Sequence, residues 1–254
     1  MTFYNEGFNS KIKSDGSPVT GADIASSIFL KDELQKTGIP IIDEESTQID
    51  YEIRKHWKKN WCVDPLDGTK EFIHKNGEFS VNIALIENQR AIFGIIASPV
   101  NQEILVGGKD FGVYILKFED SNDYKKWKKI DLTMDENNYF SLVSSRSHES
   151  TMTLNFINEL RNSFGNFGMI EKGSALKFFD LAQNEASIYP RFAPTMEWDI
   201  AAGQAILEEL GGKVISSETF EPLKYNKKNL MNPHFIGITK NLLSRFESTF
   251  QNIK

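Results

Sequence analysis

Two aspartates three residues apart form the densest chemical signal in the chain, in the stretch WCVDPLDGTKEF (61–72). The apolar run from Trp61 to Val63, bounded by proline and glycine, is typical of a buried strand that emerges into a tight turn. Asp64 and Asp67 would then lie at the end of that strand. A turn in which both carboxylates accept backbone N–H groups explains this pair about as well as a functional site does.

Two carboxylates held this close raise each other's pKa, because like charges in a partly buried site oppose double ionisation. A divalent cation removes that penalty, and Mg²⁺ prefers oxygen ligands in octahedral geometry. If the turn directs the carbonyl of Leu66 inward, then Asp64, Leu66 and Asp67 supply three oxygens from four consecutive residues. The pattern therefore predicts part of a cation site that other segments must complete.

Carboxylates at the ends of other expected elements are the candidates to complete it. They are Glu44 and Glu45 after the apolar run 39–42, Asp23 after a Gly/Pro/Ser loop, and Asp199 in a helix that stops at Gly-Gly. Each has an ordinary explanation, because an acidic residue suits the first turn of a helix. Taken together, acids at several element ends predict a cleft that binds cations.

The composition narrows the class of protein. The chain of 254 residues is 40% hydrophobic and 25% charged, as expected for one large globular domain or two packed lobes. Its net charge of −6, with both signs interspersed, indicates no nucleic-acid groove and no polybasic membrane patch. The N-terminus has no signal-peptide pattern, and no apolar run is long enough to cross a bilayer.

Cysteine usage points to the compartment. The single cysteine, Cys62, excludes an internal disulfide and fits a reducing cytoplasm. We expect this side chain to pack in the buried strand as a small apolar group. The sequence therefore predicts a soluble, cytoplasmic protein, with peripheral contact at the cytoplasmic face of the inner membrane left open.

The first half of the chain reads as one helix followed by hairpins. A helix is expected over 23–36, where Ile24, Ile28 and Leu34 follow a helical period. Strand signals then follow one another from residue 61 to residue 118 with short turns between them. Consecutive hairpins predict an antiparallel sheet.

The pattern changes once, at the acidic, asparagine-rich segment 131–138. Beyond it, strands alternate with helices, which are expected near 149–162 and over 174–186. We place the lobe boundary in this segment, with an N-terminal α+β lobe at 1–136 and a C-terminal α/β lobe at 137–254.

Three stretches of the chain together resemble the inositol monophosphatase superfamily of Mg²⁺-dependent, lithium-sensitive phosphatases. The stretches are WCVDPLDGTKEF, PTMEWDIAAGQAILEELGG and IIDEES. Within that superfamily, KSDGSPVT, SSRSH, GSALKF and YPRFAPTMEWD are similar to the 3′(2′),5′-bisphosphate nucleotidases of the CysQ type, which serve sulfur metabolism. The inositol phosphatases usually have Thr-Asn where this chain has Lys70 and Glu71. The resemblance, from about Lys13 to Phe235, implies a layered α-β-α-β-α sandwich.

Two features depart from the family pattern. Family members usually begin with an extra helix ahead of the KSDG loop, whereas this chain enters the loop almost directly. The residue before Glu44 is commonly small, and here it is Asp43, which alters the local charge. None of the expected metal ligands lies in the N-terminal segment.

The resemblance implies a site with two or three Mg²⁺ ions. Glu44, Asp64 and the carbonyl of Leu66 would hold one ion. Asp64, Asp67 and Asp199 would hold a second, so that Asp64 bridges the two. Two cations placed side by side suit in-line phosphoryl displacement, because one side meets the attacking water and the other meets the leaving oxygen.

The catalytic residues implied by the resemblance are Thr69, which contacts the attacking water, Asp23, which orients it, and Glu44. The N–H groups of Gly68 and Thr69 would meet a phosphate oxygen if they open a helix. The full set implied to contact substrate is Glu44, Leu66, Asp67, Gly68, Thr69, His148, Ser174, Lys177, Arg191 and Asp199.

Four of these, His148, Ser174, Lys177 and Arg191, match positions that contact the adenine side and the 5′-phosphate. Ordinary explanations remain open for three of them: a loop histidine, a helix cap and a solvated lysine. Arg191 fits better, because a strand-end Pro-Arg-Phe offers a rigid guanidinium suited to a phosphate. Phe178 and the other large aromatic residues nearby, Phe179 and Trp198, are expected in the core.

The sequence thus predicts a Mg²⁺-dependent phosphatase that converts 3′-phosphoadenosine 5′-phosphate to AMP by direct attack of water. An inositol or sugar monophosphatase of the same superfamily stays open as an alternative, as does a non-catalytic nucleotide sensor. The expected partner is a small molecule, adenosine 3′,5′-bisphosphate, and no nucleic acid. The oligomeric state stays open.

Overall fold

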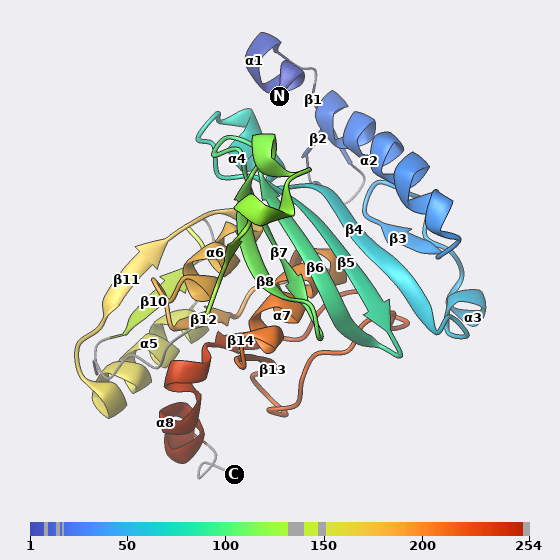
Figure 1. Cartoon of the computed structure of the whole chain (residues 1–254). Coiled ribbons are helices and arrows are strands. Elements are labelled where there is room, and N and C mark those ends of the chain that lie inside the picture. Colours follow the sequence, from blue (N-terminus) through green and yellow to red (C-terminus); the bar gives the residue numbers. More distant parts are fainter. Residues whose placement is uncertain (8–9, 14–15, 17, 132–139, 147–150, 251–254) are drawn as a thin grey trace.

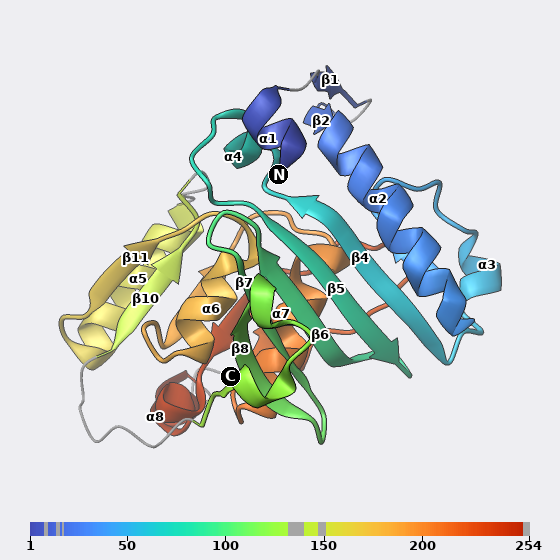
Figure 2. The ribbon, with the colours of Figure 1, turned by 45° about the horizontal axis from the view of Figure 1, so that its top comes forward.

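The computed structural model describes residues 1–7, 10–13, 16, 18–131, 140–146 and 151–250. Within these ranges the elements form the expected layers of helix, sheet, helix, sheet and helix (Figures 1 and 2). The lobe boundary expected at 136/137 and the predicted site residue His148 lie outside the described residues.

The first layer of strands is a seven-stranded sheet in the order β3-β4-β5-β6-β7-β8-β9. Every neighbouring pair is antiparallel except β3 and β4, which are parallel. The predicted hairpins are therefore confirmed. The strands are β3 (Ile41–Asp43), β4 (Lys59–Asp67), β5 (Ser80–Glu87), β6 (Arg90–Ser98), β7 (Glu103–Gly108), β8 (Gly112–Lys117) and β9 (Lys128–Lys129), and a separate hairpin joins β1 (Ser10–Ile12) to β2 (Pro18–Thr20).

The end of β4 differs from the expectation. The strand does not stop at Val63 but continues to Asp67, with a break in register between Asp64 and Asp67. The break spans Pro65, which has no N–H group to donate to a neighbouring strand. The two aspartates therefore lie within an irregular strand end, opposite β5, rather than in a free turn.

The second sheet has five strands in the order β11-β10-β12-β14-β13. Strand β10 is parallel to β11 and β12, and β14 is antiparallel to β12 and β13. The strands are β10 (Ser141–Ser144), β11 (Gly168–Glu171), β12 (Ile188–Arg191), β13 (Lys213–Ser216) and β14 (Phe235–Ile238). The predicted alternation of strands and helices is confirmed for this half of the chain.

The α-helices are α1 (Thr2–Glu6), α2 (Gly21–Leu34), α3 (Tyr51–Arg54), α4 (Thr69–Ile73), α5 (Thr151–Phe164), α6 (Lys177–Ala182), α7 (Glu197–Glu209) and α8 (Lys240–Phe250). Short 3₁₀ turns are η1 (Gln35–Thr37), η2 (Phe118–Asp120), η3 (Tyr124–Lys126) and η4 (Ser174–Leu176). The helix expected over 174–186 is thus a 3₁₀ turn followed by a shorter α6, and α8 was not expected. No helix among the described residues combines the length and the apolar character needed to span a membrane.

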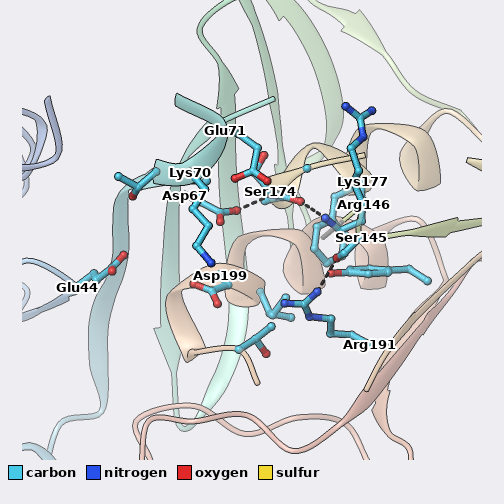
Figure 3. Close-up of a pocket in the computed structure, with 18 of the residues that line it drawn as sticks. Glu44, Asp67, Lys70, Glu71, Ser145, Arg146, Ser174, Lys177, Arg191 and Asp199 are labelled. Atoms are coloured by element: carbon cyan, nitrogen blue, oxygen red, sulfur yellow. Dashed lines mark hydrogen bonds between the residues drawn. The ribbon is translucent and has the colours of Figure 1, made fainter. Parts of the chain in front are cut away.

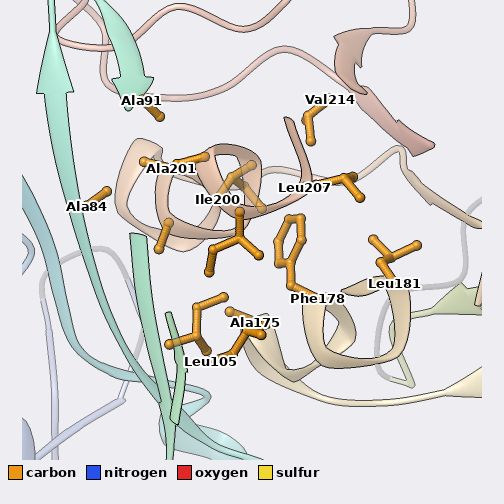
Figure 4. Packing of buried hydrophobic residues seen from close by; sticks show 14 of the residues in the cluster. Ala84, Ala91, Leu105, Ala175, Phe178, Leu181, Ile200, Ala201, Leu207 and Val214 are labelled. Carbon is orange, nitrogen blue, oxygen red and sulfur yellow. The ribbon is translucent and has the colours of Figure 1, made fainter. Parts of the chain in front are cut away.

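Helix α7 lies between the two sheets, where it packs on β5, β6 and β7 (Figures 1 and 4). Residues 200–207 of this helix are all buried, since both of its sides are covered. The approach is close on both sides, because Gly94 of β6 lies against α7 and Gly203 of α7 lies against Phe178 of α6. A Cβ atom at Gly94 would lie 2.2 Å from the carbonyl O of Ala202, and one at Gly203 would lie 2.1 Å from the ring of Phe178.

Helix α2 forms as predicted, but it does not bury its apolar period. Ile24 and Ile28 are 44% and 54% exposed, whereas Asp23 and Ser27 are buried. Ser27 donates a hydrogen bond of 2.7 Å to Asp43 at the end of β3. The inner face of this helix is therefore used for polar contacts with the sheet, and the hydrophobic periodicity predicted the wrong face.

A short helix precedes the KSDG loop, contrary to the expectation that the chain enters this loop directly. In α1, the ring of Tyr4 lies 5.2 Å from that of Phe72 and 5.1 Å from that of Phe79, measured between ring centroids. This cluster covers the base of the loop that follows β4. The main core contains Phe178, Phe179 and Trp198, which confirms the expectation for these aromatic residues. It also contains Cys62, as predicted.

We expect Gly203→Ala to lower the free energy of unfolding by about 1–3 kcal/mol, the usual cost of overpacking a core. The new methyl group would overlap Phe178, whose ring cannot move without disturbing α7. The matched control is Gly237→Ala, because a Cβ atom there would lie 3.6 Å from its nearest neighbour, an ordinary contact. Urea unfolding of both variants measures the difference, and equal costs would contradict this account of the packing.

Candidate active site

Three carboxylates from the two halves of the chain converge at one point. Asp64 and Asp67 come from the end of β4 and Asp199 from the first turn of α7. Each offers an oxygen atom, and the three oxygens lie within 4.8 Å of one another. Within the described part of the chain, this is the group of acidic, histidine or cysteine side chains with the spacing of a metal site.

Backbone N–H groups hold two of these carboxylates in place. Oδ1 of Asp64 accepts a hydrogen bond of 3.0 Å from the N–H of Leu66. Oδ2 of Asp67 accepts one of 2.6 Å from the N–H of Ala175, in the second half of the chain. The ordinary explanation for this pair, that both carboxylates accept backbone N–H groups, is therefore correct. It leaves room for a functional site, because the same carboxylates also meet in the cluster. Each bond fixes one oxygen and leaves the other to face the cluster.

The third carboxylate is fixed by the helix that carries it. Oδ2 of Asp199 accepts the N–H of Met196 at 2.9 Å and so closes the N-terminal turn of α7. Asp199 therefore caps the helix as the ordinary explanation requires. The positive end of the helix dipole also favours a negative charge at this position.

Burial raises the pKa of all three carboxyl groups, and the charges of neighbouring carboxylates raise the pKa of Asp64 and Asp199 further. For Asp64, burial and then the charges of Glu44 and Asp67 raise the pKa well above its ordinary value. Burial also raises the pKa of Asp67. Burial and the charge of Asp67 raise the pKa of Asp199 to about 8. A bound cation would offset this repulsion, and a set of hard oxygen donors fits Mg²⁺.

Glu44 follows β3 in a turn, so the alternative that it opens a helix is wrong. Its Oε1 accepts a hydrogen bond of 2.9 Å from Nζ of Lys13, which also donates to Glu45 at 2.5 Å. Burial raises the pKa of Glu44 despite this partner. Its charge acts on Asp64, although its oxygens are not among the three that lie within 4.8 Å.

Thr69 and Asp23 are in direct contact, as the predicted water-orienting pair requires. Oγ1 of Thr69 lies 3.0 Å from Oδ1 of Asp23 and 3.4 Å from the carbonyl O of Leu66. The other oxygen of Asp23 accepts from the N–H and the hydroxyl of Thr20, at 2.8 and 2.5 Å. Asp23 is thus held in one orientation. Thr69 begins α4, and Gly68 caps it with a left-handed φ of 91°.

Asp67, Asp199 and Thr69 face a cavity of about 260 Å³ (Figure 3). The predicted residues that line it are Glu44, Asp67, Gly68, Thr69, Ser174, Lys177, Arg191 and Asp199. Asp23, Asp64 and Leu66 do not line the cavity but contact or neighbour residues that do. The structure therefore brings together the predicted site residues that it describes.

Lys177 is buried, so the alternative of a solvated lysine is wrong. Its Nζ donates to the carbonyl O atoms of Lys172 and Ser174 and lies 5.2 Å from the ring centroid of Tyr189. Burial lowers the pKa of Lys177 to about 8. Its cationic form is therefore costly, and an anion in the cavity would stabilise it.

Arg191 ends β12 and points into the cavity. Its Nη1 donates to Oγ of Ser145 at 2.6 Å, and its Nη2 lies 3.4 Å from the carbonyl O of Pro194. Its Nε is buried and has no hydrogen-bond partner among the described residues. A buried donor without a partner is unusual in a native structure, and the guanidinium reaches the cavity wall through its other nitrogens.

Several lining residues were not singled out from the sequence as substrate contacts. They are Lys70, Glu71, Ser145, Arg146, Tyr189 and Thr195. All six stand within motifs that were already in view, DGTKEF, SSRSH and YPRFAPTMEWD. The signal was their position in those motifs, since their types alone are ordinary for an exposed loop.

Comparisons with known proteins agree with this geometry. A model of the inositol monophosphatase family matches residues 2–253. The 3′(2′),5′-bisphosphate nucleotidase CysQ of Escherichia coli K12 is 36% identical over 231 residues, 88% of this chain and 86% of the relative. The protein of the same name from Buchnera aphidicola is 40% identical over 223 residues, 84% of this chain and 77% of the relative. The crystal structure of CysQ from Bacteroides thetaiotaomicron has a TM-score of 0.80 and 39% identity, over 90% of this chain and 87% of that one.

Binding of Mg²⁺ to the metal-free protein should release protons at about pH 7. The pKa of Asp199, raised to about 8, keeps this carboxyl protonated there, and a cation must displace the proton. The release should shrink above pH 8, where Asp199 is already ionised. Titration calorimetry in buffers of different ionisation enthalpy counts the protons, and heats independent of the buffer at pH 7 would contradict the assignment.

The same raised pKa sets a trend in stability. The folded state binds the proton of Asp199 more tightly than the unfolded chain does. This proton therefore contributes to the free energy of unfolding in full below the ordinary carboxyl pKa of 3.8, and the contribution is lost as the pH rises toward 8. The metal-free protein should therefore melt at lower temperature as the pH rises through this window. The stabilisation by Mg²⁺ should increase over the same window.

Proposed function

The chain belongs to the inositol monophosphatase family, and on that premise we propose that it hydrolyses the 3′-phosphate of 3′-phosphoadenosine 5′-phosphate to AMP and phosphate. It is a phosphatase, and the relatives that cover most of its length are named 3′(2′),5′-bisphosphate nucleotidases. The observation that carries the proposal is one cavity that carboxylates and basic groups line together. Asp67 and Asp199 lie towards its acidic end and Lys177 and Arg191 towards its basic end, and Lys70 and Glu71 line it as well (Figure 3).

The proposed cofactor is Mg²⁺, with two or three ions in the site. The family is metal-dependent, and the buried carboxylates with raised pKa values fit hard cations. Glu44, Asp64 and the carbonyl of Leu66 would hold one ion, and Asp64, Asp67 and Asp199 another. When bound, the ions supply the positive charge that offsets these carboxylates and the charge that develops on the phosphoryl group.

Thr69 and Asp23 would orient the attacking water. A threonine hydroxyl has one hydrogen and two lone pairs, and the contact with Asp23 directs that hydrogen to the carboxylate. The lone pairs of Thr69 are then available to accept a hydrogen bond from a water molecule in the cavity. The N–H groups at the start of α4, from Gly68 and Thr69, would donate to a phosphate oxygen.

The second phosphate would bind at the basic end of the cavity. Arg191 lines this end, and so does Lys177, with a pKa lowered to about 8. A phosphate at this end would pair with the guanidinium and stabilise the charge of the lysine. Ser174 lies beside them on the same wall. The proposed compartment is the cytoplasm, because Cys62 is a free, buried thiol.

A phosphate-release assay with Mg²⁺ tests the proposed substrate. The wild-type protein should use 3′-phosphoadenosine 5′-phosphate with a much higher kcat/KM than inositol 1-phosphate or fructose 1,6-bisphosphate, because the first competitor lacks a second phosphate and the other lacks the adenosine. Comparable efficiency with inositol 1-phosphate would support the alternative of a broader monophosphatase. Nucleotide binding without release of phosphate from any of the three would support a sensor.

Arg191→Ala should raise KM for the bisphosphate nucleotide by about ten- to a hundredfold, the usual effect of losing a charge-assisted hydrogen bond. A substrate without the 5′-phosphate, adenosine 3′-monophosphate, should be affected much less. The control is Arg90→Ala, which removes an arginine that is 52% exposed and pairs with Glu208 at 3.7 Å, outside the cavity. Equal losses for both substrates would make Arg191 a structural residue.

A further inference from the structure

Glu78 reaches from the first half of the chain to two segments of the second. It lies in the loop between α4 and β5, and its side chain is 22% exposed. Oε2 accepts a hydrogen bond of 2.8 Å from the N–H of Gly173, and Oε1 accepts one of 2.8 Å from Nη2 of Arg146. One carboxylate therefore links the end of β10 to the turn that leads into η4.

The turn at Gly173 to Ala175 has an unusual backbone. Ser174 has a left-handed φ of 47°, which costs energy for a residue other than glycine. The N–H groups on both sides of it are bound to carboxylates, Gly173 to Glu78 and Ala175 to Asp67. Such a conformation persists where its surroundings determine it, and here the two carboxylates hold the turn from both ends.

The backbone of Glu78 also fixes how closely the two halves approach. A Cβ atom at Gly173 would lie 2.7 Å from the carbonyl O of Glu78, and one at Gly68 would lie 3.1 Å from the same oxygen. Two glycines thus lie against one carbonyl group. The loop that carries Glu78 has little room to shift, so its carboxylate meets the turn in one geometry.

The residues that Glu78 holds line the cavity, whereas Glu78 itself does not. Ser174 and Arg146 belong to the wall that would face the nucleotide, and the turn at Ser174 also meets Asp67 through the N–H of Ala175. We propose that Glu78 is a positioning residue that sets the preference for the nucleotide, by holding Ser174 and Arg146 in the orientation that receives it. This inference rests on the proposed function of the same cavity.

The test compares two substrates in Glu78→Ala. The bisphosphate nucleotide needs the wall that Glu78 positions, whereas p-nitrophenyl phosphate needs only the acidic end of the cavity. KM for the nucleotide should rise by about tenfold, the effect of one hydrogen bond to a charged group, with kcat little changed. The kcat/KM for p-nitrophenyl phosphate should stay the same.

Two further variants separate the two contacts of Glu78. Glu78→Gln keeps an oxygen that can accept from Gly173 but removes the charge that holds Arg146, so its KM should fall between those of the wild type and Glu78→Ala. Combined with Arg146→Ala, the set forms a double-mutant cycle, and the two effects should not be additive. If Glu78→Ala does not fold, the isosteric Glu78→Gln variant tests the proposal in its place.

The matched control is Glu103→Ala. Like Glu78, Glu103 is a partly exposed glutamate with a basic partner, here Lys117 at 2.8 Å, but it lies on the β7–β8 hairpin and does not line the cavity. If Glu78→Ala lowers the use of both substrates by one factor together with the melting temperature, the role is structural and the inference is overturned. If the wild type prefers the nucleotide and Glu78→Ala keeps that preference, the inference alone fails. A wild type without that preference overturns the proposed function and the inference together.

Discussion

The structure depends on holding three carboxyl groups together inside the protein, where their negative charges would repel one another. The carboxyl groups of Asp64, Asp67 and Asp199 lie within 4.8 Å of one another, and burial raises the pKa of each. This repulsion is opposed by backbone N–H donors and by the start of α7, and the cations that we propose for the site would oppose it further. The folded protein stores an unfavourable arrangement that ligand binding relieves, and this is the physical basis of the affinity we propose for metal ions.

Packing supplies the rigidity that such a site needs. Helix α7 carries Asp199 and lies between two sheets, where Gly94 and Gly203 allow an approach that any side chain would prevent. The opposite arrangement holds for α2, whose inner face bears Asp23 and Ser27 and whose apolar Ile24 is exposed. One helix is therefore positioned by dry packing and the other by polar contacts. Both helices carry in their first turn a carboxylate that lines the cavity or contacts a residue that lines it.

The two ends of the cavity are coupled through shared backbone. The turn at Ser174 is bound to Asp67 at the acidic end and to Glu78 at the rim. Lys177, one helical turn further on, donates to the carbonyl of Ser174 and carries a pKa lowered to about 8 by burial. A change in one carboxylate is therefore expected to move the groups that receive the nucleotide. Substrate preference and metal binding share this turn, although different residues carry them.

The sequence by itself determined the hairpins of the first sheet, the strand-helix alternation of the second half and the acids of the site, because these are local patterns. Asp64 and Asp67 are three residues apart, so their proximity follows from the chain. Only the tertiary structure decided that Lys177 is buried and that α2 exposes its apolar face, because burial depends on what packs against a residue. It also decided the reach of Glu78, whose partner Gly173 is 95 residues away. No local periodicity records a contact of that kind, since it forms only when two segments that are far apart in the sequence pack together.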